Sequence, residues 1–200
     1  MKNMMIFGFM IFAVTCVVFA QEKKLPNDPE FKYQVSFHND GNVEEIPLRS
    51  FRTRMEKIFH NPGFDHSLPE AWAITTGSKK VIVAIIEDGF CYNHEDVAAN
   101  IWQNPGETGF DDEGLDKATN GKDDDNNGYI DDVMGYDFAF NDPDPDPYIF
   151  DGMRDDNIKP NWHGIQVMGI IGAQGNNGIG VAGINWNVSM MLLKAGKQGK

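Results

Sequence analysis

The sequence predicts an α/β fold built on a parallel sheet, and three stretches carry that prediction. Residues 80–86 form a continuous, largely β-branched apolar run, which suits a strand covered on both faces. The stretch HGIQVMGIIGAQGNNGIGVAGI, which begins at His163, is small and apolar, as in a buried helix followed by a glycine turn. A second strand-like run, NVSMMLLKA, follows at residues 187–195. Strand, helix and strand in this order make a βαβ unit, and because Lys200 comes soon afterwards the sheet looks incomplete at the C-terminus.

The rest of the chain is organised around this unit. Residues 21–66 are polar and irregular, and we expect them to form an N-terminal extension that packs on the domain. Residues 67–200 then form a partial main domain, which opens with a short helix that Ser67 can cap and Gly77 can end. A long excursion, at about residues 104–160, separates the first strand from the buried helix.

Residues 1–20 have the pattern of a cleaved export signal. Lys2 supplies a positive start, an apolar run follows, and Val18 and Ala20 are small residues ahead of a cut before Gln21. A transmembrane anchor is the alternative, but the run is short and has no basic stop-transfer flank. The prediction is a protein that is secreted, periplasmic or at the cell surface, with no membrane contact after cleavage.

The cysteines limit how the mature chain can be stabilised. A lipid anchor on Cys16 is a weaker interpretation, because Thr15 is a poor residue before a lipid-modified cysteine. After cleavage only Cys91 remains, so no internal disulfide can form.

The net charge of −13 is concentrated in the excursion. Between Glu107 and Asp156 there are 17 acidic side chains against three basic ones. This charge argues against nucleic acid or an anionic membrane surface as a partner. The segment has no helical or strand period, so we expect a loop, and its NDPDPDPY stretch is typical of a stiff linker. A block of like charge is either solvated and disordered or holds cations.

Within this segment, DDDNNGYIDD has the spacing of a calcium-binding loop. Oxygen ligands at positions 1, 3, 5 and 9, a glycine at position 6 and a backbone carbonyl at position 7 are typical of the start of an EF-hand-like loop. Position 12 is Met134, so another residue must close the shell. The alternative is a solvated acidic loop. The predicted ligands are Asp123, Asp125, Asn127, Tyr129 through its carbonyl, and Asp131.

An acid and a histidine are predicted to meet at the end of the first strand. Glu87 and Asp88 end that strand, and His163 opens the helix that packs beside it. Functional groups collect at the carboxyl ends of parallel strands. A carboxylate beside an imidazole fixes the ring tautomer and stabilises the imidazolium that forms when a hydroxyl is deprotonated. The plainer interpretation, a polar strand end and a capping histidine, is favoured on spacing alone.

Two longer blocks together resemble the subtilisin-like serine proteases, the subtilases. These blocks are VIVAIIEDGFCYNHEDVAANIWQNPGE and NWHGIQVMGIIGAQGNNGIGVAGINWNVSMMLLKAG, and the resemblance extends over about Leu68 to Lys200. It implies a three-layer subtilisin-like fold around the parallel sheet. It also implies hydrolysis of peptide bonds in protein or peptide substrates through an acid, a histidine and a serine, in that chain order.

The histidine block of the family carries over to the start of the buried helix. The matching residues are His163, Gly164, Val167 and Gly169, and His163 would be the general base. The chain departs from the family pattern at Ile165, Gln166 and Met168.

In the first block, Gly89 fixes the register, because the acid of the family lies two residues before this glycine. Glu87 therefore has the orienting position, and Asp88 has the Ser/Thr place. A glutamate must reach with one extra methylene, and a catalytic group misplaced by about 1 Å can lower the rate roughly a hundredfold.

The resemblance places the oxyanion-hole asparagine and the nucleophilic serine well downstream. None of the five serines has the expected setting, and Ser189 lies within the second strand. As written, the chain is predicted to be truncated before both groups. The predicted function is a serine endopeptidase. The alternative is a catalytically inactive, secreted, calcium-binding pseudoprotease or protein-binding module, which the glutamate and the missing serine favour.

The resemblance also implies calcium at two places. The DDDNNGYIDD stretch resembles the Asp-Gly-Asn-Gly-Tyr-Val-Asp-Asp pattern of long-insert subtilases. The Gly-aromatic-Asp that follows in that family is matched here by Gly135, Tyr136 and Asp137. A second calcium site is implied by the resemblance alone, at Asp96, Asn177 and the carbonyls of Gly175, Ile179 and Val181.

Overall fold

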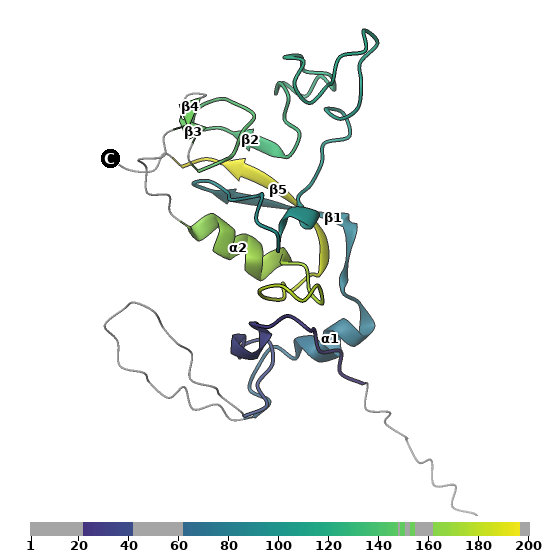
Figure 1. Ribbon diagram of the computed structural model, residues 1–200, viewed down its shortest axis with the longest axis vertical. Helices are drawn as coiled ribbons and strands as arrows, with labels where there is room; N and C mark the ends of the chain where they lie inside the picture. The colour runs from purple at the N-terminus through teal and green to yellow at the C-terminus, as the bar shows by residue number, and fades with distance from the viewer. Residues whose placement is uncertain (1–21, 42–61, 148, 151–152, 155–161, 197–200) are drawn as a thin grey trace, which may run out of the picture.

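The computed structural model describes residues 22–41, 62–147, 149–150, 153–154 and 162–196 (Figure 1). The predicted signal at residues 1–20 lies outside the described residues. The described elements, in chain order, are η1 (Phe31–Tyr33), α1 (Leu68–Ile74), β1 (Gly77–Glu87), η2 (Ala98–Asn100), β2 (Gly135–Asp137), β3 (Ile149–Phe150), β4 (Met153–Arg154), α2 (His163–Gly172) and β5 (Asn187–Lys194).

A three-stranded parallel sheet positions the candidate site. Its strand order is β1-β5-β2, so β5 lies in the middle. The connection from β1 through α2 to β5 confirms the predicted α/β unit. At the carboxyl end the register joins Glu87 of β1 to Lys194 of β5, and Lys194 to Asp137 of β2. Three charged residues therefore lie side by side where the strands end.

β2 corrects the expectation that the acidic excursion is loop throughout. Gly135–Asp137 is fully buried and pairs in parallel with the last residues of β5. Close approach explains the glycine, because a Cβ at Gly135 would lie 1.8 Å from the carbonyl oxygen of Leu192. The rest of the acidic segment before β2 projects beyond the sheet (Figure 1).

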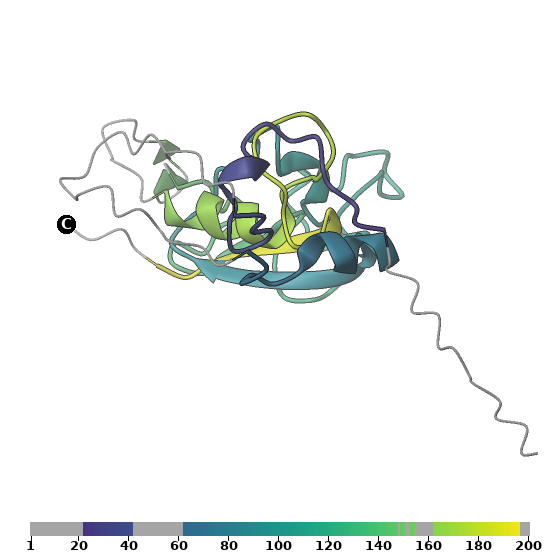
Figure 2. The same ribbon diagram turned by 90° about the horizontal axis from the view of Figure 1, so that it is seen from below.

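The expectation that β1 is covered on both faces is wrong for the described chain. Ile82 and Ile86 are 51% and 68% exposed. Helix α2 lies on one side of the sheet (Figure 2). Alternate residues of a strand point to opposite faces, so only the face with Ile85 contributes to the core.

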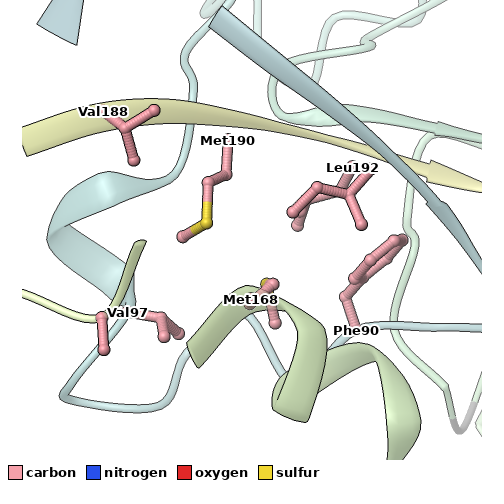
Figure 3. Packing of buried hydrophobic residues seen from close by; sticks show 8 residues of the cluster. Phe90, Val97, Met168, Val188, Met190 and Leu192 are labelled. Atoms are coloured by element: carbon pink, nitrogen blue, oxygen red, sulfur yellow. The ribbon is translucent and has the colours of Figure 1, made fainter. Parts of the chain in front are cut away.

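The main core lies between the sheet and α2. Val188, Met190 and Leu192 of β5 point toward Met168 of α2, and Phe90 closes the group from the turn after β1 (Figure 3). Each of these side chains is at most 1% exposed. Gly172 is required for this packing, because a Cβ there would lie 2.6 Å from Val188 Cγ1.

The N-terminal extension packs on the loop that follows α2. Gln34 donates to the carbonyl of Ala182 at 2.8 Å and accepts from its N–H at 2.9 Å. Trp72 of α1 packs against Trp186 with ring centroids 4.9 Å apart. A second, smaller core cluster thus joins the extension and α1 to the domain. Ser67 stands at the N-cap of α1, but its side chain makes no capping hydrogen bond, contrary to the expectation.

Candidate active site and calcium-binding loops

The predicted acid and histidine are in contact at the carboxyl edge of the sheet. Glu87 is the last residue of β1, and His163 is the first residue of α2. Glu87 Oε1 lies 2.9 Å from His163 Nδ1. The histidine side chain is 55% exposed and the glutamate side chain 20% exposed. A carboxylate therefore contacts one ring nitrogen, while more than half of the histidine side chain is exposed.

Two glycines bring these elements together. A Cβ at Gly164 would lie 2.1 Å from the carbonyl oxygen of Gly89, so the first turn of α2 touches the turn after β1 only because residue 164 is glycine. Gly89 has φ 144°, and a Cβ there would lie 2.7 Å from Cα of Pro147. The sequence motif therefore has a direct packing reason at both glycines.

The neighbouring candidates have other surroundings. Asp88 lies against the backbone after β5, since a Cβ at Gly196 would lie 2.8 Å from its Cβ. Ser189 is 9% exposed, and its hydroxyl donates to the carbonyl of Lys79 at 2.8 Å. Ser189 is therefore part of the sheet, as expected from its place in the run that forms β5.

The predicted calcium loop is closed by its own carboxylates. Asp123 accepts from the N–H of Asn127 at 3.0 Å and from the N–H of Gly128 at 2.8 Å. Asp125 also accepts from the N–H of Asn127 at 3.0 Å, and Asn127 Oδ1 accepts from the N–H of Tyr129 at 2.8 Å. The side chains at positions 1, 3 and 5 thus converge on one turn.

Glu107 joins this loop, although the spacing of the motif did not indicate it. Ligand oxygens of Glu107, Asp123 and Asp125 all lie within 4.8 Å of one another. Glu107 is fully buried, and its Oε1 accepts from the N–H groups of Asp124 and Asp125 at 2.8 and 3.2 Å. Its buried Oε2 makes no hydrogen bond to any residue that the structure describes. Burial raises the pKa of Glu107 above its ordinary value.

The remaining polar residues of the loop divide into two groups. Asp132 is buried, which raises its pKa, and it accepts from Asn104 at 2.8 Å and from Asn127 at 3.0 Å. Asp131 lies apart from the Glu107 group: its φ is 54° and its Oδ1 accepts from the N–H of Gly121 at 3.1 Å. The donor set fits a hard cation, because a buried anionic oxygen faces two further carboxylates.

The second predicted site is also assembled around a buried acid. Asp96 is 3% exposed, and it accepts from Asn177 Nδ2 and from the N–H of Val181, both at 3.0 Å. Ile179 donates its N–H to Asn177 Oδ1 at 2.8 Å. Burial raises the pKa of Asp96.

Asp28 of the extension reaches the same turn, and sequence patterns did not indicate it. It is 5% exposed and accepts from the N–H groups of Asn176 and Asn177 at 2.7 and 3.1 Å. Asp28 lies 68 positions before Asp96 in the chain, so only the tertiary fold brings the two acids to one turn.

Among the residues that the structure describes, no helix is both long and apolar enough to cross a membrane.

Comparison with known proteins gives consistent matches. A family model described as "Subtilase family" matches residues 78–200. "Subtilisin-like protease 1" of Plasmodium vivax is 38% identical over 118 residues, which are 59% of this chain and 16% of that protein. "Neuroendocrine convertase 2" of Homo sapiens is 27% identical over 161 residues, 80% of this chain and 17% of that protein. "Thermophilic serine proteinase" of Bacillus sp. (strain AK1) is 26% identical over 125 residues, 62% of this chain and 20% of that protein.

The chain therefore spans only 16 to 20% of the length of these relatives. The family match covers more than half of the chain and includes β1 from Ser78, helix α2 with His163, and β5. The chain belongs to the subtilase family, as an N-terminal part of its catalytic domain.

Proposed function

We propose that this chain is the N-terminal part of a secreted, calcium-stabilised serine endopeptidase. The single observation that carries the proposal is the 2.9 Å contact between Glu87 Oε1 and His163 Nδ1 at the carboxyl edge of the sheet. An oriented, solvent-open imidazole at this place is what acyl transfer to a serine hydroxyl requires. Protein or peptide substrates follow from the same proposal.

The proposed chemistry gives each residue one role. His163 Nδ1 donates to the Glu87 carboxylate, which leaves Nε2 as the acceptor of a proton. Nε2 takes the proton of the attacking serine hydroxyl and later gives it to the leaving amine. Glu87 holds the ring in this tautomer and stabilises the imidazolium. The serine and the oxyanion-hole asparagine would come from a part of the protein beyond residue 200.

The contact also bears on the substitution of glutamate for the family aspartate. The extra methylene raised the question whether residue 87 could orient the ring at all. A hydrogen-bond distance of 2.9 Å supports an orienting role for the longer side chain.

In this proposal calcium also stabilises two loops of the domain. We propose that Glu107, Asp123 and Asp125 supply carboxylate oxygens to the first ion, with Asn127 and the carbonyl of Tyr129 as further ligands. Asp131, which lies apart from this group, is not part of the proposed shell. The buried Oε2 of Glu107 supports this proposal most directly. The second ion would use Asp96, Asn177, Ile179 and Val181. When bound, calcium supplies positive charge that offsets mutual repulsion among these carboxylates.

A second candidate is a catalytically inactive calcium-binding pseudoprotease that binds protein partners. Glu87 in place of the family aspartate favours it. The exported location, the extension at residues 21–66 and the partial domain at residues 67–200 belong equally to both candidates. The two differ only in whether the assembled site reacts.

The experiment that separates the candidates uses the full-length gene product and a fluorophosphonate probe. The protease proposal expects covalent labelling and cleavage of a quenched fluorescent peptide, both abolished in His163→Ala. The matched control is His66→Ala, since His66 is exposed and lies in the segment before α1, outside both the candidate active site and the candidate calcium sites. A folded full-length protein that is neither labelled nor active would contradict the protease proposal and leave the pseudoprotease.

Calcium binding is tested separately on the 200-residue chain by titration calorimetry. We expect Asp123→Ala and Glu107→Gln to weaken binding of calcium at the first site. Asp112→Ala is the control, because this exposed residue of the same insert removes the same charge outside the loop. Equal binding by Asp123→Ala and wild type would count against the loop as a calcium site.

A further inference from the structure

The sheet end that carries Glu87 also carries a buried lysine. Lys194 ends β5, and its register places it between Glu87 of β1 and Asp137 of β2. The side chains of Val188, Met190, Leu192 and Lys194 alternate along β5 and are all buried on the α2 side. Ile85 and therefore Glu87 point to that same face. A cation thus lies between two carboxylates at one edge of the sheet.

The ammonium group is paired with Asp137. Lys194 Nζ lies 2.7 Å from Asp137 Oδ2, with the two side chains 1% and 0% exposed. Nζ also donates to the carbonyl of Asp146 at 3.0 Å. Asp137 Oδ1 accepts from the N–H groups of Ala139 and Phe140 at 2.8 and 3.1 Å, so its carboxylate is fixed from both sides. Among the described residues, the ion pair of Lys194 goes to Asp137 and that of Glu87 goes to His163.

We propose that Asp137 and Lys194 are positioning residues for the Glu87–His163 pair. Asp137 holds the Lys194 ammonium toward β2, and the Glu87 carboxylate therefore stays with the imidazole. The proposal rests on the proposed function of that pair. Neither Asp137 nor Lys194 is proposed to touch substrate.

The physical reason is that Lys194 and His163 can compete for the Glu87 carboxylate. Adjacent parallel strands are only about 4.8 Å apart, so the two carboxylates that flank Lys194 are both within reach of its long side chain. A buried ammonium that loses its partner turns to another anion, because leaving a charge unpaired in the interior is strongly unfavourable. Without Asp137, Glu87 is the anion at the same register on the same face, whereas Asp142, which also interacts electrostatically with Lys194, belongs to the loop after β2. A lysine that pairs with Glu87 withdraws from His163 the oxygen that orients its ring.

Lys194 also fixes the loop that covers the turn after Glu87. Its contact with Asp146 holds the segment in which Pro145 accepts the N–H of Phe90 at 3.0 Å and Pro147 packs on Gly89. This segment was expected to be a stiff linker with no chemistry of its own. Within this stretch, Pro145 and Pro147 are buried and lie against the turn after β1.

The test uses the tautomer of His163 in the full 200-residue chain. Long-range proton–nitrogen NMR spectra, recorded where the imidazole is neutral, distinguish the Nδ1–H from the Nε2–H form. We expect wild type to show the Nδ1–H pattern, Asp137→Asn to lose it, and the double variant Asp137→Asn/Lys194→Met to regain it. Asp144→Asn is the control, since it removes one charge from the same loop while Asp144 contacts Tyr92 rather than Lys194.

Two results overturn the proposal. One is an unchanged Nδ1–H pattern in folded Asp137→Asn. The other is loss of the pattern in both the single and the double variant, as a purely structural ion pair predicts. Recovery in the double variant is the result that a structural role does not produce.

A second measurement decides the case in which Asp137→Asn does not fold. In Glu87→Gln the buried pair is intact, and we expect the Nζ nitrogen resonance of Lys194 to keep its wild-type position. A shifted Nζ resonance would mean that Lys194 already shares Glu87, and the proposal fails. Neither readout needs proteolysis, so an inactive full-length protein would contradict the proposed function without affecting this result.

Discussion

Glu87 shows how one side chain can depart from a family pattern and still occupy its place. The residue lies at the last position of β1, and the first residue of α2 faces it. The packing of Gly164 on Gly89 sets the separation between these two elements. With that separation fixed by backbone, the length of the acid decides whether it meets the ring. The glutamate meets it at 2.9 Å.

Substitutions at residue 87 should therefore separate the effect of the side chain's charge on the rate from the effect of its length. In the full-length protein we expect Glu87→Gln to lower kcat by roughly 10⁴-fold, since an amide in this place favours the wrong histidine tautomer. Glu87→Asp keeps the charge but withdraws it by one methylene, and a displacement of about 1 Å lowers the rate by roughly a hundredfold. Steady-state kinetics on a peptide substrate measures both. A faster Glu87→Asp variant would show that the backbone separation suits aspartate instead.

The candidate site illustrates which residues a sequence can reveal. Asp123, Asp125 and Asn127 are recognisable because their alternation reflects the local geometry of one loop. Glu107 is 16 positions earlier and joins them only in the folded chain. Asp28 reaches the turn after α2 for the same reason. Local spacing predicts local ligands, whereas a ligand from a distant segment depends on how the tertiary structure is assembled.

The ion pair between Lys122 and Asp111 in the acidic insert gives a prediction about pH dependence. Lys122 lies 2.9 Å from Asp111, and this hydrogen bond, with N–H donors from Leu115 and Glu113, lowers the pKa of Asp111 from 3.8 to about 2. A depressed carboxyl pKa contributes stability above the unfolded value, and that contribution is lost as the pH falls through the folded value. The insert should therefore lose this anchor between about pH 4 and pH 2.

Lys122→Met should raise the pKa of Asp111 toward 3.8. Carboxyl carbon NMR during an acid titration follows this group directly. Lys117→Met is the matched control, because Lys117 donates to the carbonyl of Gly106 and leaves Asp111 with its partner. An equal shift in both variants would show that general charge, rather than the contact, sets the pKa.

At the scale of elements, the sequence predicted those that carry a long, largely apolar run. β1, α2 and β5 were all expected, and each lies close to its expected bounds. β2 was missed because it has only three residues, and one of them is glycine and another aspartate. Its pairing with β5, rather than its own composition, makes it a strand. The same reason explains why exposure of β1 was misjudged, since a strand sequence does not say which neighbours cover it.

The packing of α2 on the turn after β1 can be tested by substituting two glycines of α2, Gly164 and Gly169. A Cβ at Gly164 would lie 2.1 Å from the carbonyl oxygen of Gly89, whereas the nearest such atom to a Cβ at Gly169 is Val181 Cγ2 at 4.0 Å. We expect Gly164→Ala to lower the free energy of unfolding by about 1–3 kcal/mol and to disturb the Glu87–His163 contact. Gly169→Ala should be neutral or gain up to about 1 kcal/mol, because alanine favours helix. Urea unfolding compares the two, and equal effects would refute the packing explanation.

At the scale of the whole molecule, acidic side chains are buried in loops outside the main apolar core. Asp96, Glu107 and Asp132 are at most 7% exposed, and burial raises the pKa of each. An ionised carboxylate in such a place is unfavourable unless cations or donors surround it. The main apolar core of the described residues is meanwhile confined to one face of a three-stranded sheet. The stability of the folded chain should therefore depend on cations held by these loops, as well as on apolar burial.

This dependence can be measured as the effect of calcium on thermal unfolding of the 200-residue chain. Calcium that binds only the folded state at about 100 times Kd adds about 2.7 kcal/mol, which for a chain of this size raises Tm by about 5–10 °C. Magnesium should raise it less, because it gives up its water ligands reluctantly and requires a stricter geometry than these loops provide. Glu107→Gln should reduce the calcium-dependent rise, because it replaces the buried anionic oxygen with a neutral amide. A calcium-independent Tm in wild type would show that the buried carboxylates are satisfied by the protein itself.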